Sequence, residues 1–403
     1  MALDINIRTI NQLPLWKRDF EIVERKGLGH PDTICDSLMD SMSVALCDAY
    51  KREFGVILHH NLDKCLLTAG RSEPAFGGGK IIEPMKVFMG DRATMNVGEK
   101  TLDVRKIMED NGRKWFQNNM RYVDSKEGVK FFSEVQPGSQ NLSDIFKRKK
   151  TEYLGANDTS ATVGYYPFTP TEDLVKRLES YLNSTLFHSL YPCSGEDVKI
   201  MAYRNAKGID LTVAIALVDG FIKNEREYFS EKNSIQQEIF ELASKRCTIP
   251  ITGIHLNALD VAGRGTDGLY LTVSGTSAEA GDSGQVGRGN DVAGIIPLCR
   301  PMASEAAPGK NPVSHVGKIY NALSFKIAKR VFWETKGAEE VYCWLLSRIG
   351  KPINEPAAVS VQTISEGELK PYWSPIIEEI VEEEFENLDK FCKELAKGKI
   401  KLY

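Results

Sequence analysis

The segment Gly27-Leu28-Gly29-His30-Pro31-Asp32 separates a predicted strand from a long predicted helix. Residues 20–24 before it form a short strand-like run, which the glycines end. The proline suits the first turn of a helix, where its missing N–H costs nothing. Apolar residues then repeat at helical spacing from Ile34 to Ala49, so we expect a helix that Gly55 ends.

The start of this helix carries side chains that could hold a metal ion and an anion. Asp32, Asp36 and Asp40 are four residues apart, which places them along one helix face. Stacked carboxylates repel, and a divalent cation near Asp32 would relieve part of that cost. His30 lies just before the helix start, where backbone N–H groups attract anions. In the plainer alternative Asp32 caps the helix while Asp36 and Asp40 face solvent, and spacing alone does not choose between the two.

A second candidate segment, Gly275–Asn290, is dense in glycine and serine and is predicted to be an irregular loop. Its glycines permit close backbone approach to a ligand, and successive N–H groups can form an anion nest. Asp282 could bind a metal ion, and Arg288 could bind phosphate. The segment matches neither a Walker A loop nor a dinucleotide fingerprint. A flexible surface loop is the alternative.

A third candidate, Gly309–Pro312, precedes His315 and Lys318 on the first turns of another predicted helix. A basic cluster at a helix start opposes the helix dipole, and a bound anion would explain it. A lysine in an ordinary turn is the competing interpretation.

Three other polar positions carry weaker signals. The tight loop 155–160 could read a ribose or a base through Asn157 and Asp158, but its local sequence favours an ordinary turn. Lys199 is uninformative without context. The pair His59-His60 is expected on a strand, where neighbouring side chains point to opposite faces, so a shared metal is not predicted.

Composition limits the class of protein. The 403 residues favour two or three domains. A net charge of −4 gives no electrostatic footprint for DNA or RNA. We find no signal peptide and no apolar stretch of membrane-spanning length, so neither a membrane nor a nucleic acid is expected as partner. Eight scattered cysteines predict reduced thiols in a cytoplasmic protein.

The remaining pattern mixes strands and helices irregularly. Helices are expected over 103–119, 170–187 with Thr171 as cap, 223–246, 313–334 and after Pro375; strands are expected over 56–58 paired with 64–68, 81–90, 208–220 and 269–273. Several strands come in pairs, which favours α+β layers with antiparallel or mixed sheets over a doubly wound parallel sheet. We expect the polar segment 98–130 to be a mobile cover.

Together the motifs show a family resemblance. Gly27–Asp36 resembles the opening motif of the S-adenosylmethionine synthetases (methionine adenosyltransferases). The others are similar to the archaeal-type branch of that family and occur in the right order over nearly the whole chain. They are His59-His60-Asn61, Gly70-Arg71-Ser72, Gly77-Gly78-Gly79, Asn157–Ser160, Gly275–Asn290, Pro308–Pro312, His315–Asn321 and Ile349–Pro352.

The resemblance implies a reaction with ATP and L-methionine. The methionine sulfur attacks C5′ of ATP and displaces triphosphate, which is then hydrolysed to phosphate and pyrophosphate. No protein nucleophile is needed, so catalysis comes from alignment and from stabilising the leaving triphosphate. Mg²⁺, two ions per site, is implied as cofactor. The better known branch also uses K⁺, and Asn61 lies near the position of an acidic ligand there.

The resemblance also implies roles for single residues. The catalytic and phosphate-binding residues would be His30, Lys199, Arg288 and Lys310. Contacts with ATP or methionine would come from Asn157, Asp158, Ser160, Asp197, Gly281, Gly284, His315 and Lys318. The Mg²⁺ ligands would be Asp32 and Asp282. The chain departs from the family pattern at Pro137, at Lys80 and at His315, which stands near a lysine of the better known branch.

The fold implied by the family has three similar α/β domains with pseudo-threefold symmetry, each a sheet with helices on one face. We place them at about 1–150, 151–265 and 266–403, with the chain crossing between them. The working unit would be a homodimer with sites between subunits. Two other hypotheses stay open at this point: a nucleotide-binding scaffold that has lost the chemistry, and another ATP-dependent transferase on the same fold.

Overall fold

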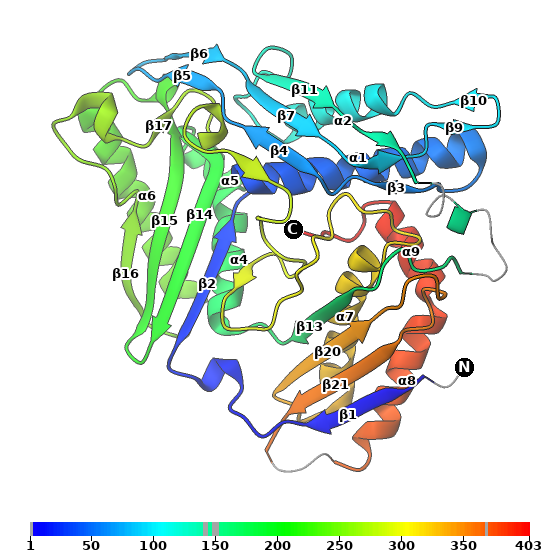
Figure 1. Cartoon of the computed structure of the whole chain (residues 1–403). Coiled ribbons are helices and arrows are strands. Elements are labelled where there is room, and N and C mark those ends of the chain that lie inside the picture. The colour runs from blue at the N-terminus through cyan, green and yellow to red at the C-terminus, as the bar shows by residue number, and fades with distance from the viewer. Residues whose placement is uncertain (1–2, 140–143, 147–152, 367–369) are drawn as a thin grey trace.

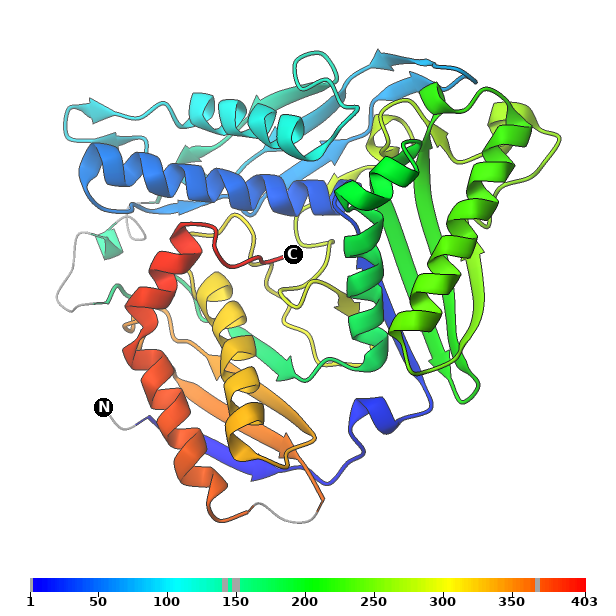
Figure 2. The ribbon, with the colours of Figure 1, turned by 180° about the vertical axis from the view of Figure 1, so that it is seen from behind.

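The computed structural model describes residues 3–139, 144–146, 153–366 and 370–403. They form three α/β units, each a sheet with helices packed on one face (Figures 1 and 2). Each unit has its own apolar core. The predicted fold class is therefore confirmed, while the pseudo-threefold relation and the domain boundaries stay predictions.

The first unit contains the long helix that follows the glycine segment. Its sheet has the order β11 (Val129–Ser133), β7 (Met85–Met89), β4 (Cys65–Thr68) and β18 (Gly284–Gln285). The helices α1 (Pro31–Phe54) and α2 (Val104–Asn119) cover one face of it (Figure 2). Two-stranded and three-stranded ribbons complete the unit: β5 (Arg71–Glu73) with β6 (Lys80–Glu83), β9 (Asn96–Val97) with β10 (Lys100–Thr101), and β12 (Gln136–Pro137), β8 (Arg92–Ala93) and β3 (His60–Asn61).

The second unit has the longest strands. Its sheet has the order β16 (Ile251–Leu256), β15 (Gly208–Val218), β14 (Ser194–Asn205), β2 (Glu21–Lys26) and β19 (Ile296–Pro297), and β17 (Leu271–Thr272) also pairs with β15. Its helices are α4 (Pro170–Leu182), α5 (Thr185–Leu190) and α6 (Glu225–Arg246). The apolar side chains that alternate along β15 (Ile209, Leu211, Val213, Ile215 and Leu217) are all buried.

The third unit joins the two ends of the chain. Its sheet has the order β1 (Ile5–Thr9), β21 (Ala358–Ile364), β20 (Glu340–Leu346) and β13 (Ala161–Tyr166). Its helices are α7 (Val316–Thr335), α8 (Trp373–Glu386) and α9 (Leu388–Ala396). Strand β1 is parallel to β21, whereas β20 is antiparallel to both neighbours, so the predicted mixed sheets are confirmed.

Several predicted elements differ from the structure. The helix expected over 170–187 is broken into α4 and α5, and its cap is Thr169, which forms a capping box with Glu172, rather than Thr171. The last helix is broken at Asn387. The strand expected over 81–90 is split at Pro84, since proline lacks the N–H that a sheet ladder needs.

The predicted pairing of 56–58 with 64–68 is wrong. Residues 56–58 lie outside any strand, and β4 pairs with β7 and with β18, which comes from the glycine-rich segment. Strand partners so distant in sequence depend on tertiary packing and leave no local signal. The strand expected over 269–273 shortens to Leu271–Thr272. The helix α2 packs into the first core through Met108, Trp115 and Phe116, which argues against 98–130 as a mobile cover.

Candidate functional site

The helix α1 begins with His30 as its N-cap residue. The His30 Nδ1 accepts a hydrogen bond from the backbone N–H of Asp32 at 3.2 Å. Asp32 is therefore not the cap, contrary to the plainer sequence interpretation. Burial lowers the pKa of His30 to about 4, so the ring is neutral at pH 7. Because Nδ1 is an acceptor, the ring proton lies on Nε2, which can donate to an anion.

Asp32 ties the start of α1 to two other segments. Its Oδ1 accepts the backbone N–H of Gln285 at 2.9 Å, and its Oδ2 lies 2.8 Å from the Lys26 Nζ. The same ammonium donates to the carbonyl of Arg288 at 2.6 Å. The strand β2, the helix start and the glycine-rich segment therefore meet at one carboxylate.

Asp36, one helical turn further, holds the glycine-rich segment against α1. Its Oδ1 accepts the Gly287 N–H at 2.8 Å. Its Oδ2 is buried and has no hydrogen-bond partner among the described residues. Burial, with the neighbouring Asp32 charge as a smaller cause, raises the pKa of Asp36 to about 7. The alternative in which Asp36 faces solvent is wrong, because the glycine-rich segment covers this face of the helix. Sequence spacing could not show that a loop so distant in the chain lies there.

The raised pKa gives Asp36 a testable effect on stability. Between about pH 4 and 7 the native Asp36 carboxyl binds a proton that the unfolded chain does not. The free energy of unfolding therefore falls by about 1.4 kcal/mol for each unit by which the pH rises across that range. Asp36→Asn keeps an acceptor for Gly287 and removes this dependence. We expect the variant to exceed the wild type in melting temperature at pH 8 without Mg²⁺ and to match it near pH 4. A difference that is constant with pH would contradict the assignment.

Glycines let the loop approach α1 closely. A Cβ on Gly284 would lie 2.1 Å from the Pro31 carbonyl oxygen, and one on Gly289 would lie 2.2 Å from the Asp36 Oδ2. The predicted ligand contact Gly281 is exposed, and its N–H donates to the Ser277 carbonyl. At Gly284, the glycine therefore serves loop packing in this structure.

The start of α1 contacts the glycine-rich segment on one side and the strand β14 on another. Asp197 is buried there, and its Oδ2 accepts the backbone N–H and the hydroxyl of Ser277 at 2.8 and 2.6 Å. Burial raises the pKa of Asp197 to about 6. Lys199 pairs in register with Lys26 and extends its half-exposed ammonium to within 3.2 Å of the Glu24 Oε1.

The metal and phosphate candidates of the loop reach solvent beside β14. Asp282 and Arg288 are both exposed. The Asp282 Oδ1 accepts the N–H of Ser283 at 2.8 Å. Among the described residues no ion pair involves the Arg288 guanidinium, so it is available to an anion. We call this group the helix-start cluster: Lys26, His30, Asp32, Asp197, Lys199, Asp282 and Arg288.

A second group surrounds Lys310, which is buried. The Lys310 Nζ lies 2.9 Å from the Asp63 Oδ2, 2.7 Å from the Glu305 Oε2 and 2.5 Å from the Ala306 carbonyl oxygen. The Ser160 hydroxyl donates to the Glu305 Oε1 at 3.2 Å. We call this group the lysine cluster: Asp63, Ser160, Glu305, Lys310 and His315.

The predicted nucleoside loop lies against the lysine cluster. The backbone N–H of Asn157 donates to the Ser314 carbonyl at 3.2 Å, and the Asn157 Oδ1 is buried without a partner among the described residues. Asp158 is exposed and accepts its neighbour's N–H. His315 is the N-cap residue of α7, and burial holds its pKa well below the usual range, so it is neutral.

Lys318 has a different environment from the one expected of a substrate contact. It is 1% exposed, and its Nζ lies 2.7 Å from the Asp40 Oδ1. Asp40 therefore does not face solvent, and the lysine charge is neutralised inside the chain. A direct contact of Lys318 with ATP stays a prediction.

The two clusters lie at different positions along α1. The Lys310 carbonyl accepts the hydroxyl of Ser43 at 3.1 Å, about 20 Å along the helix from His30 at 1.5 Å per residue. No hydrogen bond or ion pair among the described residues joins Lys310 to His30, Asp32, Asp282 or Arg288. The two groups share no direct bond among the described residues, but Glu305 and Asp36 line the same cavity.

Sequence reasoning missed three residues of these clusters. Lys26, Asp63 and Glu305 each hold a predicted site residue in an ion pair. A signal existed only for Lys26, which ends β2 directly before the glycine segment. The two side chains of the pair His59-His60 have different surroundings: His60 bonds Ser43 at 2.8 Å, and His59 is buried beside the Phe146 ring.

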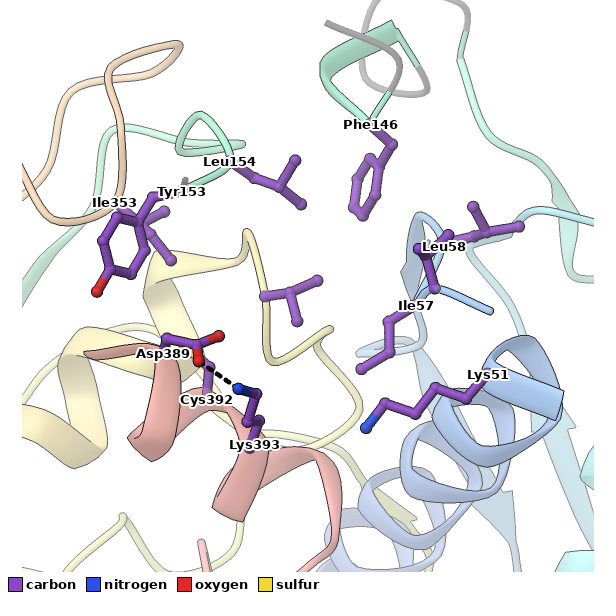
Figure 3. Close-up of a pocket in the computed structure, with 12 residues that line it drawn as sticks. Lys51, Ile57, Leu58, Phe146, Tyr153, Leu154, Ile353, Asp389, Cys392 and Lys393 are labelled. Carbon is purple, nitrogen blue, oxygen red and sulfur yellow. Dashed lines mark hydrogen bonds and ion pairs between the residues drawn. The ribbon is translucent and has the colours of Figure 1, made fainter. Parts of the chain in front are cut away.

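The structure also contains a cavity of about 320 Å³ at the other end of α1 (Figure 3). Its wall is mostly apolar, with Lys51 and the Asp389–Lys393 ion pair at one side. It contains no residue predicted for the site, so we do not assign it to the reaction.

Carboxylates, lysines and an arginine around a helix start are typical of enzymes that act on a nucleotide polyphosphate with metal ions. The chain belongs to the S-adenosylmethionine synthetase family, whose model, "S-adenosylmethionine synthetase (AdoMet synthetase)", matches residues 3–399.

Relatives span the whole chain. The probable S-adenosylmethionine synthase of Aquifex aeolicus is 42% identical over 94% of both chains. The S-adenosylmethionine synthase of Pyrococcus furiosus is 41% identical over the full length of both. The solved structure of an unusual S-adenosylmethionine synthetase from Campylobacter jejuni covers 94% of both chains with a TM-score of 0.59 and 15% identity, which shows a shared fold. In the described part of the chain, none of the helices has the length and apolarity needed to span a bilayer.

Proposed function

We propose that this chain synthesises S-adenosylmethionine from ATP and L-methionine and then hydrolyses the displaced triphosphate to phosphate and pyrophosphate. The family match over residues 3–399 carries the first part of this proposal. The helix-start cluster supports the second part, because it combines a neutral histidine donor with the exposed cationic side chains of Arg288 and Lys199. The eight cysteines are free in the structure, which supports a cytoplasmic protein.

His30 would act on the leaving group. Its Nδ1 is held by the Asp32 N–H, which orients the ring and leaves the Nε2 proton for a triphosphate oxygen. Arg288 and Lys199 carry exposed charges on segments that meet at the helix start and would neutralise the polyanion. The residues need only position ATP and methionine, because sulfur itself is the nucleophile.

The donors present fit Mg²⁺. Asp32 and Asp282 offer carboxylate oxygens, and Mg²⁺ in phosphate-transfer sites is typically held by one or two carboxylates plus substrate oxygens and water. In the structure Lys26 neutralises Asp32. Bound Mg²⁺ would supply Lewis-acid stabilisation of the triphosphate, and we propose two ions per site. A potassium ion near Asn61 also stays a prediction; the Asn61 Oδ1 is buried and lacks a partner among the described residues.

We propose that the site is completed across a homodimer. In the described part of the chain no hydrogen bond or ion pair joins the lysine cluster to the helix-start cluster, which supports this. The outer face of the first sheet supports it too. Leu66, Phe88 and Phe132 lie side by side on β4, β7 and β11, are 38–44% exposed, and the two phenylalanine rings stack at 4.8 Å. Such an apolar row is typical of a protein interface.

One assay tests the proposal. The full chain is incubated with ATP, L-methionine, Mg²⁺ and K⁺, and its products are separated. We expect a sulfonium nucleoside together with both phosphate and pyrophosphate. ADP or AMP as the nucleotide product would refute the function, and an active monomer in sedimentation under assay conditions would refute the shared site.

A further inference from the structure

Glu305 connects two groups that the proposed function assigns to ATP. Its Oε1 accepts the Ser160 hydroxyl at 3.2 Å, and its Oε2 lies 2.7 Å from the Lys310 Nζ. Ser160 belongs to the predicted nucleoside loop, and Lys310 is the predicted phosphate lysine. No motif of the sequence marked Glu305.

The Lys310 ammonium has no donor left for a phosphate. A lysine ammonium carries three N–H groups. Lys310 has three acceptors within 3 Å: the Asp63 and Glu305 carboxylates and the Ala306 carbonyl. A phosphate oxygen can bind Lys310 only if one of these acceptors leaves.

Glu305 is the acceptor that can leave. The Ala306 carbonyl is part of the backbone. The Asp63 side chain is 8% exposed and is also held by Asn61 at 3.1 Å and Lys64 at 2.6 Å. The Glu305 side chain is 26% exposed, and apart from Lys310 it accepts only the hydroxyl of Ser160 among the described residues. Of the two carboxylates, Glu305 is the nearer to solvent and would break fewer contacts on leaving.

We propose that Glu305 is a positioning residue that occupies the place of a substrate phosphate on Lys310 and is displaced when the triphosphate chain arrives. This inference rests on the proposed function. In the free enzyme Glu305 completes the set of acceptors around the buried Lys310 ammonium. A buried ammonium with an acceptor missing would destabilise the fold. In the complex the polyphosphate repels the carboxylate and takes over its partner. The exchange weakens phosphate binding, because each binding event must break the Glu305–Lys310 ion pair.

The variant Glu305→Gln tests this exchange. Glutamine can still accept from Ser160 and Lys310, so the fold is retained, but it no longer competes as an anion. We expect inorganic tripolyphosphate with Mg²⁺, titrated calorimetrically into the full chain, to bind about three- to tenfold more tightly, which equals about 0.7–1.4 kcal/mol. The KM for ATP should fall in parallel while kcat does not rise. Glu53→Gln, which removes an exposed carboxylate at the far end of α1, should leave both values unchanged.

Tighter tripolyphosphate binding by Glu305→Gln cannot result from damage to the fold, so a gain supports the inference. Equal or weaker binding by a folded Glu305→Gln would overturn it. Should that variant fail to fold, Glu305→Asp, one methylene too short to contact both partners, is expected to show a smaller gain. A wild type that forms S-adenosylmethionine while Glu305→Gln shows no gain refutes only this inference. A wild type that forms no S-adenosylmethionine refutes the proposed function itself.

Discussion

Replacing His30 with asparagine is expected to lower kcat for S-adenosylmethionine formation by about 10²-fold or more without unfolding the chain. The asparagine carbonyl occupies the place of Nδ1 and still accepts the Asp32 N–H, so the helix cap is retained. The Nε2 donor, which would face the triphosphate, is lost. Because burial already keeps the ring neutral at pH 7, the loss reflects a missing hydrogen bond rather than a missing positive charge.

Two companion variants separate the cap from the chemistry. His30→Gln places an amide N–H near the position of Nε2 but loses the cap acceptor, so it should retain more activity than His30→Asn and melt lower. His30→Ala loses both and should combine the defects, with a cap cost of about 1 kcal/mol. The measurements are steady-state kcat and the melting temperature. Full turnover by His30→Asn would show that the donor role is misassigned.

The features that the sequence predicted are local. The helix expected over 103–119 agrees with α2 within one residue at its start, and the glycine segment located the start of α1. Short-range capping and side-chain periodicity act within a few residues, so one sequence contains them. Apart from Lys26, the members of the helix-start cluster followed from motif position, although their contacts did not.

What could not be predicted depends on segments distant in sequence. The partner of Asp36 lies in the glycine-rich loop and the partner of Asp40 lies on α7, more than 200 residues away. The three aspartates therefore form a row that docks other segments onto α1, rather than a solvated face. Glu305 could not be predicted for the same reason, because its proposed role depends on its contacts with Ser160 and Lys310 in the fold.

Replacing Lys318 with methionine is expected to destabilise the chain by about 3–5 kcal/mol, the usual cost of leaving one charge of a buried ion pair unpaired. Methionine preserves most of the side-chain volume, so the cost falls on Asp40, which would stay buried without its partner at 2.7 Å. The measurement is chemical denaturation followed by far-UV circular dichroism, with the first transition compared between variants. Lys326→Met, which removes a half-exposed lysine from the same helix, is the control and should cost far less.

A double variant decides between a structural role and a substrate role for Lys318. Lys318→Met combined with Asp40→Leu removes both charges, and removing both partners of a buried pair is often neutral or stabilising. If the pair serves only to dock α7 onto α1, the double variant should recover at least half of the lost stability and bind ATP with a nearly unchanged KM. If Lys318 binds ATP directly, as its motif position predicts, stability would recover while the KM for ATP stays raised. Because the two readouts change independently, the pair of measurements assigns the residue whichever result is obtained.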